Sequence, residues 1–145
     1  RGFEVPLSDK AVCVDIARER FGGAIGYLAG DFMDDDLGSP YDAVLLSNII
    51  HGMGADEVRA LFGRLAAVMA PGGLMLIKDM LVDELGLFPE AGVFFNLIML
   101  LFTERGRSYG LTELNELCTE TGFGDLDHLL LADSGHSLLF ARRQA

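Results

Sequence analysis

One stretch of the sequence, from Tyr41 to Asp79, constrains the fold more than any other. It begins with a short apolar run at 41–47, which has the length of a buried strand. A helical pattern of apolar residues follows, with Asp56 as its expected N-cap, and the Pro-Gly-Gly sequence at 71–73 is expected to end that helix. A second apolar strand lies at 74–77. Two buried strands joined by one helix should be parallel neighbours with a right-handed crossover.

Polar residues stand at the ends of both predicted strands. Ser47, Asn48 and His51 follow the first strand, and Lys78 and Asp79 follow the second. Ligands of parallel sheets bind at the carboxyl ends of the strands. An imidazole placed there can take a proton from a substrate hydroxyl, and a carboxylate can orient it. The residues alone also allow His51 to be a helix-flanking side chain bound to backbone, and Asp79 to be a turn former.

Two further carboxylates, Glu4 and Asp31, are predicted at strand ends. A carboxylate at the end of a second Rossmann-type strand can accept hydrogen bonds from ribose hydroxyls. Asp31 is followed by Phe32 and Met33, so a carboxylate and an apolar side chain could together bind an adenine ring. Capping of helices or turns is the alternative role for both acids.

Along the rest of the chain, strands and helices are expected to alternate, with an antiparallel hairpin at the end. This order predicts an α/β sheet that is mostly parallel with an antiparallel final strand. The expected segments are a strand tail at 1–6, a helix opened by 7–9 and ended at 22–23, a strand at 24–29, an acidic turn at 34–40, a loop at 81–89, an apolar helix at 90–102, a loop at 104–110, a helix from the N-cap Thr112 to 121, and strands at 123–131 and 137–141 joined by a turn at 133–135.

Composition excludes several classes of function. A net charge of −11 argues against a nucleic-acid or anionic-membrane surface, since both need a basic patch. The apolar run at 91–102 is too short to cross a bilayer and contains Asn96, so a buried helix is expected there. Cys13 and Cys118 are expected to be buried free thiols of a cytoplasmic protein. The acidic run at 34–36 is interpreted as a solvated loop, and no metal site is predicted.

Taken together, several short strings are similar to one family of enzymes. The strings FEVP, GDF, YDAVLLSNIIH, PGGLMLIKD, GRSY and TGF resemble, in order, the catalytic domain of S-adenosylmethionine-dependent O-methyltransferases. The most similar members are the small-molecule enzymes of plant phenolic and bacterial polyketide pathways. The resemblance covers nearly the whole chain and implies one partial domain over 1–145 with a Rossmann-like class I methyltransferase sheet.

The resemblance also implies roles for particular residues. Glu4 would bind the ribose of S-adenosylmethionine, while Asp31 and Phe32, with Met33 beside them, would bind its adenine. Ser47 is a further predicted cofactor contact. His51 would be the catalytic base, with Asp79 as the acidic residue that orients it. Phe95, Asn96 and Met99, together with Phe94 and Phe102, would line the acceptor pocket, although a plain core role fits about half of these helix positions equally.

The sequence departs from the family pattern in three respects. It begins at about the end of the second strand, so the first strand, its glycine-rich loop and the amino-terminal dimerisation domain have no match. Gly52 and Met53 follow His51, where the family often has Asp and an aromatic residue. Ser108 stands where plant members place a second acidic residue beside the base.

The expected function is therefore transfer of a methyl group from S-adenosylmethionine to a hydroxyl of a small, aromatic molecule. Three alternatives stay open. A nucleotide-binding oxidoreductase could use Glu4 at a nicotinamide ribose, the chain could be an inactive piece of an enzyme, or it could be a repurposed relative that does not methylate. Assembly as a homodimer also stays open.

Overall fold

The computed structural model describes residues 5–38, 40–131 and 135–145. The chain divides into two compact units, residues 1–39 and residues 40–145, and each is described by itself. The interpretation of 1–145 as one partial domain stays a prediction.

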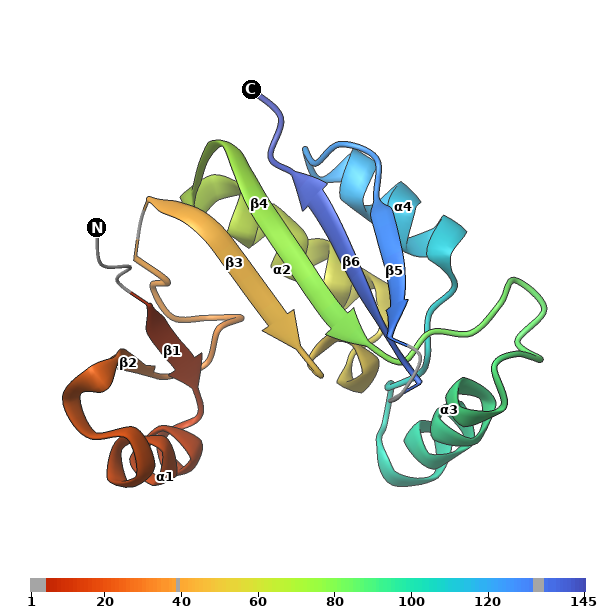
Figure 1. Cartoon of the computed structure of the whole chain (residues 1–145), viewed down its shortest axis with the longest axis horizontal. Coiled ribbons are helices and arrows are strands. Elements are labelled where there is room, and N and C mark those ends of the chain that lie inside the picture. The colour runs from red at the N-terminus through yellow and green to blue at the C-terminus, as the bar shows by residue number, and fades with distance from the viewer. Residues whose placement is uncertain (1–4, 39, 132–134) are drawn as a thin grey trace. The chain divides into compact units, whose positions relative to one another are not determined.

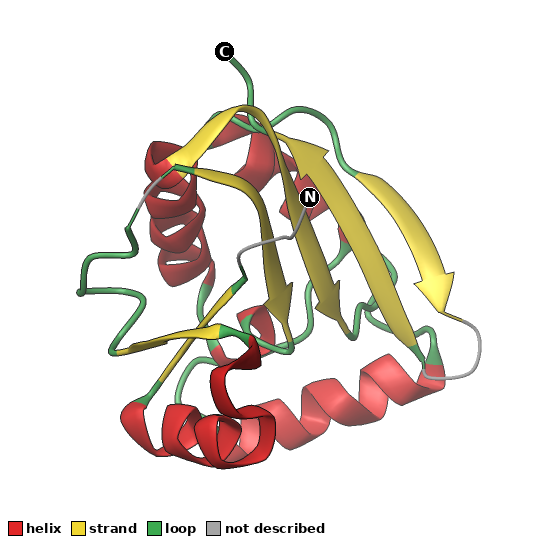
Figure 2. Ribbon diagram, turned by 60° about the vertical axis from the view of Figure 1, so that its left-hand side comes forward, coloured by secondary structure: helices red, strands yellow, loops and turns green. Residues whose placement is uncertain are grey.

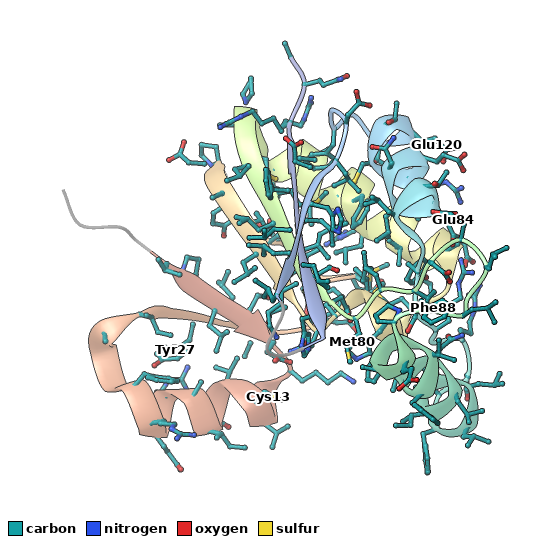
Figure 3. The ribbon with its side chains drawn as sticks, turned by 45° about the vertical axis from the view of Figure 1, so that its right-hand side comes forward. Cys13, Tyr27, Met80, Glu84, Phe88 and Glu120 are labelled. Carbon is teal, nitrogen blue, oxygen red and sulfur yellow. The ribbon has the colours of Figure 1, made fainter. Side chains whose placement is uncertain are left out.

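The first unit contains a parallel pair of short strands and one helix (Figure 1). Strand β1 (Pro6–Asp9) pairs with β2 (Gly26–Ala29), and between them lie α1 (Ala11–Phe21) and the short 3₁₀ helix η1 (Gly22–Ala24). Tyr27 of β2, labelled in Figure 3, donates a hydrogen bond to Gly22 O at 2.8 Å. The hydroxyl of Tyr27 therefore ties β2 to the C-terminal end of α1.

The predicted positions of the first strand and the first helix were wrong by several residues. The sequence pattern placed a strand tail at 1–6 and the beginning of a helix at 7–9, whereas residues 6–9 form β1 and the helix begins at Ala11. Pairing with β2 holds residues 6–9 in an extended conformation, so the helix begins only after them. Residues 1–4, which include the predicted ribose ligand Glu4, lie outside the described residues.

The second unit is built on a four-stranded sheet in the order β3-β4-β6-β5 (Figure 1). Strands β3 and β4 are parallel, and β6 is antiparallel to both β4 and β5. Three of these strands thus run in one direction and β6 opposes them, which confirms the α/β class with an antiparallel final strand. The bounds are β3 Tyr41–Ser47, β4 Met69–Asp79, β5 Asp127–Leu131 and β6 His136–Arg142.

Helix α2 (Ala55–Val68) connects β3 to β4, but its ends differ from the prediction. Its N-cap is Gly54 rather than Asp56, and the Glu57 carboxylate accepts a hydrogen bond from the Gly54 N–H at 2.7 Å. The helix ends at Val68, and β4 runs through the Pro-Gly-Gly sequence. The pairing of β3 with β4 is irregular there, because Gly72 has a φ of +77° and the backbone at Gly73 leaves no room for a side chain.

Helices α2 and α4 (Leu111–Glu120) cover one face of this sheet, as Figures 1 and 2 show. The rings of Phe62 and Phe123 meet edge to face within this core, with centroids 6.4 Å apart. Gly110, rather than Thr112, is the N-cap of α4, and the carboxylate of Glu84 (Figure 3) accepts a hydrogen bond from the Thr112 N–H. The predicted strand at 123–131 is shorter, because Phe123 forms only an isolated bridge to Arg143 and β5 begins at Asp127.

The two cysteines differ in environment. Cys118 of α4 is buried, and this burial raises the pKa of its thiol to about 12. Cys13 of α1 is exposed, so the expectation of two buried thiols was wrong for Cys13. The pattern around Cys13 did not reveal this because the apolar residues of α1 are spread around the helix; only Val14 and Ala17 are buried.

Helix α3 (Glu90–Phe102) has the predicted bounds but not the predicted burial. Gly92 is its only buried residue. Six of its large apolar residues are exposed: Phe94, Leu97, Ile98, Leu100, Leu101 and Phe102. A helix that is apolar all round has no periodicity that selects a buried face, so its composition alone overstated its burial. Among the described residues, no helix combines the length and the apolar character that a membrane crossing requires.

Candidate active site

The ends of β3 and β4 bring His51 and Asp79 together. Ser47 and Lys78 are paired in the parallel register, so both strands end at the same edge of the sheet. After β3 the chain turns through Asn48, which adopts a left-handed φ of +56° and donates its N–H to Lys78 O at 2.8 Å. A 3₁₀ turn, η2 (Ile50–Gly52), then carries His51 back towards the end of β4.

The two side chains form a close hydrogen bond. His51 Nδ1 lies 2.8 Å from Asp79 Oδ1, and the His51 backbone N–H donates to Asp79 Oδ2 at 3.3 Å. The Met80 N–H also donates to Asp79 Oδ1, at 2.8 Å. Asp79 is only 1% exposed, so three donors hold a buried carboxylate in one orientation.

This arrangement determines what His51 can do. A carboxylate can only accept at Nδ1, so the favoured neutral tautomer carries its proton on Nδ1 and leaves Nε2 free to accept one. The side chain of His51 is 20% exposed, which leaves part of the ring accessible. If Nε2 takes a proton, the nearby Asp79 carboxylate stabilises the resulting positive charge. The pair can therefore act as a general base.

Helix α3 contributes one face to the surroundings of His51. The Phe95 ring meets the His51 ring edge to face, with centroids 4.8 Å apart. Asn96 accepts a hydrogen bond from the Ser108 N–H at 2.8 Å. Phe95, Asn96 and Met99 are all partly buried, whereas Phe94 and Phe102 are 66% and 81% exposed. Within the described unit, the first three predicted pocket residues therefore share the inner side of α3 and the other two do not.

Ser108 does not act on His51 as a second acid would. Its side chain is buried, and its hydroxyl lies 3.3 Å from Gly92 O, to which it donates. Both its N–H and its hydroxyl are therefore directed to α3. Asp79 supplies the carboxylate contact to His51, as the sequence comparison with the family suggested.

The predicted adenine site lies in the first unit. Asp31 and Phe32 line a hollow of about 170 Å³ together with Ser8, Tyr27 and Leu28. Asp31 Oδ1 accepts a hydrogen bond from the Met33 N–H at 2.8 Å, which fixes the carboxylate at the start of the turn. Met33 is not among the residues that line this hollow. The predicted cofactor contact Ser47 belongs to the second unit, where it is exposed at the end of β3.

The described residues contain no group of three His, Cys, Asp or Glu side chains placed to hold a metal ion. Gly106, Arg107 and Tyr109 contact the turn around His51 but were not among the predicted site residues. The GRSY string pointed to this segment, but its resemblance directed attention only to Ser108.

The chain is similar in sequence to a known family of proteins and to individual members of it. The O-methyltransferase domain family matches residues 2–124. The chain is 31% identical over 120 residues to 3-hydroxy-5-methyl-1-naphthoate 3-O-methyltransferase of Streptomyces sahachiroi, covering 83% of this chain and 34% of that protein. It is 28% identical over 102 residues to the tetracenomycin polyketide synthesis 8-O-methyl transferase of Streptomyces glaucescens, covering 70% of this chain and 30% of that protein.

Solved structures agree with these sequence relatives. The structure of human N-acetylserotonin methyltransferase in complex with S-adenosylmethionine aligns with a TM-score of 0.89 and 25% identity, covering 99% of this chain and 41% of that one. The mixed α/β fold is that of the class I O-methyltransferases. The chain belongs to the O-methyltransferase domain family. It spans about a third of the length of the curated relatives that it matches.

Proposed function

We propose that the protein containing this chain is an S-adenosylmethionine-dependent O-methyltransferase that acts on a hydroxyl of a small aromatic molecule. The single observation that carries the proposal is the pair formed by His51 and the buried Asp79 at the shared end of two parallel strands. A general base at this place matches the chemistry of a family that methylates hydroxyls. Membership of the family supplies the reaction class.

The residues of the first unit fit the nucleoside part of the cofactor. Asp31 presents a fixed carboxylate, and Phe32 presents an aromatic ring, at the hollow that both residues line. In the proposal, Asp31 accepts a hydrogen bond from the adenine amino group and Phe32 packs on the ring. Glu4, Met33 and Ser47 are further proposed contacts. When bound, S-adenosylmethionine supplies an electrophilic methyl group on a sulfonium centre.

The residues of the second unit prepare the acceptor. His51 Nε2 takes the proton of the acceptor hydroxyl as the oxygen attacks, and Asp79 keeps the imidazole oriented and stabilises its charge. Such a base contributes a factor of about 10²–10⁴ in rate. Orientation of the reacting groups can contribute up to roughly 7–11 kcal/mol to lowering the barrier. Binding of the acceptor in one orientation can therefore contribute more to the rate than removal of the proton.

The inner face of α3 favours an aromatic acceptor. Phe95 contacts His51 directly, and Met99 lies one turn further along the helix. An aromatic ring and a thioether suit the flat faces of another aromatic ring. Two of the relatives are named for a naphthoate and for acetylserotonin, and a third is named for tetracenomycin polyketide synthesis.

A homodimer and a cytoplasmic location remain predictions.

The proposal is tested with the full-length protein and 3-hydroxy-5-methyl-1-naphthoate as the probe acceptor. Incubation with methyl-labelled S-adenosylmethionine should give a product that carries the label on the 3-oxygen, identified by mass spectrometry. The matched control is the same naphthoate with its hydroxyl already methylated, which should take up no label. If the protein does not methylate this naphthoate, the assay is extended to a panel of naphthols and catechols.

The rival oxidoreductase is tested by calorimetric titration with S-adenosylhomocysteine and, separately, with NAD. Binding of S-adenosylhomocysteine without binding of NAD is the expected result. Binding of NAD alone, or absence of labelled product with every acceptor of the panel, would contradict the proposed function.

A further inference from the structure

The segment 103–110, between α3 and α4, contacts the turn that carries His51. The Arg107 N–H donates a hydrogen bond to His51 O at 2.8 Å. Gly106 packs against the same carbonyl so closely that a Cβ there would lie 2.5 Å from His51 O. Arg105 adds ion pairs to Asp56 and Glu57 at the start of α2. This segment therefore limits how far the His51 turn can move.

Tyr109 makes the most deeply buried of these contacts. It is 1% exposed, and its hydroxyl donates a hydrogen bond to Met53 O at 2.6 Å. Met53 lies just after the η2 turn, and its own N–H donates to Ile50 O at 3.1 Å. Burial raises the pKa of the Tyr109 phenol, which keeps the hydroxyl protonated as a donor. The Tyr109 hydroxyl therefore holds the C-terminal end of the η2 turn through Met53 O.

The backbone of Tyr109 reaches the strand that carries Asp79. Tyr109 O accepts a hydrogen bond from the Val82 N–H at 3.1 Å. Val82 lies shortly after the end of β4, so one residue is bonded to the chain that follows each member of the His51–Asp79 pair. The Arg107 guanidinium lies 4.5 Å from the centre of the Tyr109 ring and forms an ion pair with Glu113. These contacts fix the ring itself.

We propose that Tyr109 is a positioning residue that holds the backbone of the His51 turn, and thereby the imidazole, against Asp79. The inference rests on the proposed function for its catalytic consequence, but its structural consequence can be measured without any acceptor. The Tyr109 hydroxyl donates to Met53 O, so in this proposal it acts on the imidazole through the backbone of the turn. A purely structural tyrosine would stabilise the fold without changing the state of the imidazole.

The direct test replaces Tyr109 by Phe in the full-length protein labelled with ¹⁵N-histidine. The Tyr109→Phe variant keeps the ring and removes only the hydroxyl. The readout is the exchange rate of the His51 Nδ1 proton with water, with the resonance assigned by its loss in His51→Gln. We expect exchange to become about tenfold faster, because the turn opens more often when one buried hydrogen bond is lost.

Tyr27→Phe is the matched control. The Tyr27 hydroxyl also donates to backbone carbonyls, those of Gly22 and Ala17, but in the first unit. Its removal should leave the His51 proton exchange rate within twofold of the wild type. This control is compared only in the exchange measurement, because Tyr27 also lines the hollow of the proposed adenine site. In the methylation assay, Tyr109→Phe should lower kcat about tenfold and leave the acceptor KM within twofold, since the turn is displaced but the acceptor surface is kept.

Gly106→Ala provides a second variant if Tyr109→Phe does not fold. Its Cβ would lie 2.5 Å from His51 O and displace that carbonyl, so the variant should accelerate the same proton exchange. An unchanged Nδ1 exchange rate in Tyr109→Phe would overturn the inference, and so would failure of both variants to fold. If His51→Gln methylates at the wild-type rate, the proposed base fails, while the proton-exchange result for Tyr109 still decides this inference.

Discussion

Helices α2 and α3 are nearly equal in length, yet the protein uses them differently. Helix α2 has 14 residues and buries five of them along one face, namely Val58, Leu61, Phe62, Leu65 and Ala66. Helix α3 has 13 residues, is more apolar, and buries only Gly92. Burial in this unit therefore follows the arrangement of apolar residues and the presence of a facing element, rather than their number.

The two helices also differ in role: α2 supports the fold, whereas the inner face of α3 borders the candidate site. Helix α2 begins directly after the His51 turn and packs against the sheet and α4, so it fixes where that turn ends. Helix α3 is attached through a few specific contacts: Gly92 against Leu81, Asn96 to Ser108 and Phe95 to His51. Changes in α2 should therefore act on folding, and changes on the inner face of α3 should act on the site.

The largest expected difference is between one phenylalanine of each helix. Phe62→Ala should lower the free energy of unfolding by about 3–5 kcal/mol, because Phe62 is fully buried and its loss leaves a cavity. Phe102→Ala should change it by less than about 0.5 kcal/mol, since Phe102 is 81% exposed. Urea denaturation of the two variants measures both values. Equal losses would show that α3 is as deeply packed as α2.

A second prediction concerns the carboxylate that holds His51 between these helices. Asp79→Asn should lower the methyl-transfer rate about 10²-fold, because the amide cannot stabilise a charged imidazole. Asp42→Asn, at an exposed carboxylate of β3, is the control and should leave the rate unchanged. The measurement is the single-turnover rate at saturating S-adenosylmethionine. A loss of less than threefold in Asp79→Asn would remove Asp79 from the mechanism.

The same substitution should have opposite effects in the two helices. Gly92→Ala should destabilise the fold by about 1–3 kcal/mol, because its Cβ would lie 2.2 Å from Leu81 O. Gly63→Ala in α2 should stabilise it by about 0.5–1 kcal/mol, since nothing lies within 4 Å of that Cβ and alanine favours a helix. Thermal unfolding of the pair gives both signs. A stabilising Gly92→Ala would mean that α3 is not held by this close approach.

The smallest effect is expected in the loop that leads into α3. Asp83 Oδ1 accepts hydrogen bonds from the Leu87 and Phe88 N–H groups, and these bonds hold the pKa of Asp83 below its ordinary value of 3.8. A lowered pKa stabilises the folded state above the ordinary value, and this contribution is lost as the pH falls through the folded-state pKa. Asp83→Asn should therefore melt slightly below the wild type at pH 7, and this difference should disappear as the pH falls through the folded-state pKa of Asp83, which lies below 3.8. A difference that grows in acid would contradict this account.

Regular elements were predictable from the sequence where the local pattern was sufficient. The bounds of β3 and α3 match, because each is an apolar run of characteristic length between polar or turn residues. The predicted caps Asp56 and Thr112 were wrong, since glycines are the N-caps of both helices; Glu57 bonds to the start of α2 and Glu84 to the start of α4. Residues 6–9 were misassigned because pairing with β2 is a contact that a local pattern cannot show.

Some residues of the candidate site were predictable from the sequence and others were not. His51 and Asp79 were predictable because strand ends meet at one edge of a parallel sheet. Tyr109 was not, because its contact with Met53 joins residues far apart in the sequence through a hydroxyl and a backbone carbonyl. Nor could composition show that the apolar side chains of α3 are exposed, since burial depends on what faces a helix.

The most direct test of the central claim is the rate of a single methyl transfer in His51→Gln. The full-length variant is first shown to bind S-adenosylhomocysteine with wild-type affinity, and the transfer is then followed with both substrates saturating. We expect a rate about 10²–10⁴-fold below that of the wild type, because proton removal by His51 is lost. A rate within a few-fold of the wild type would contradict it, and positioning alone would then carry the reaction.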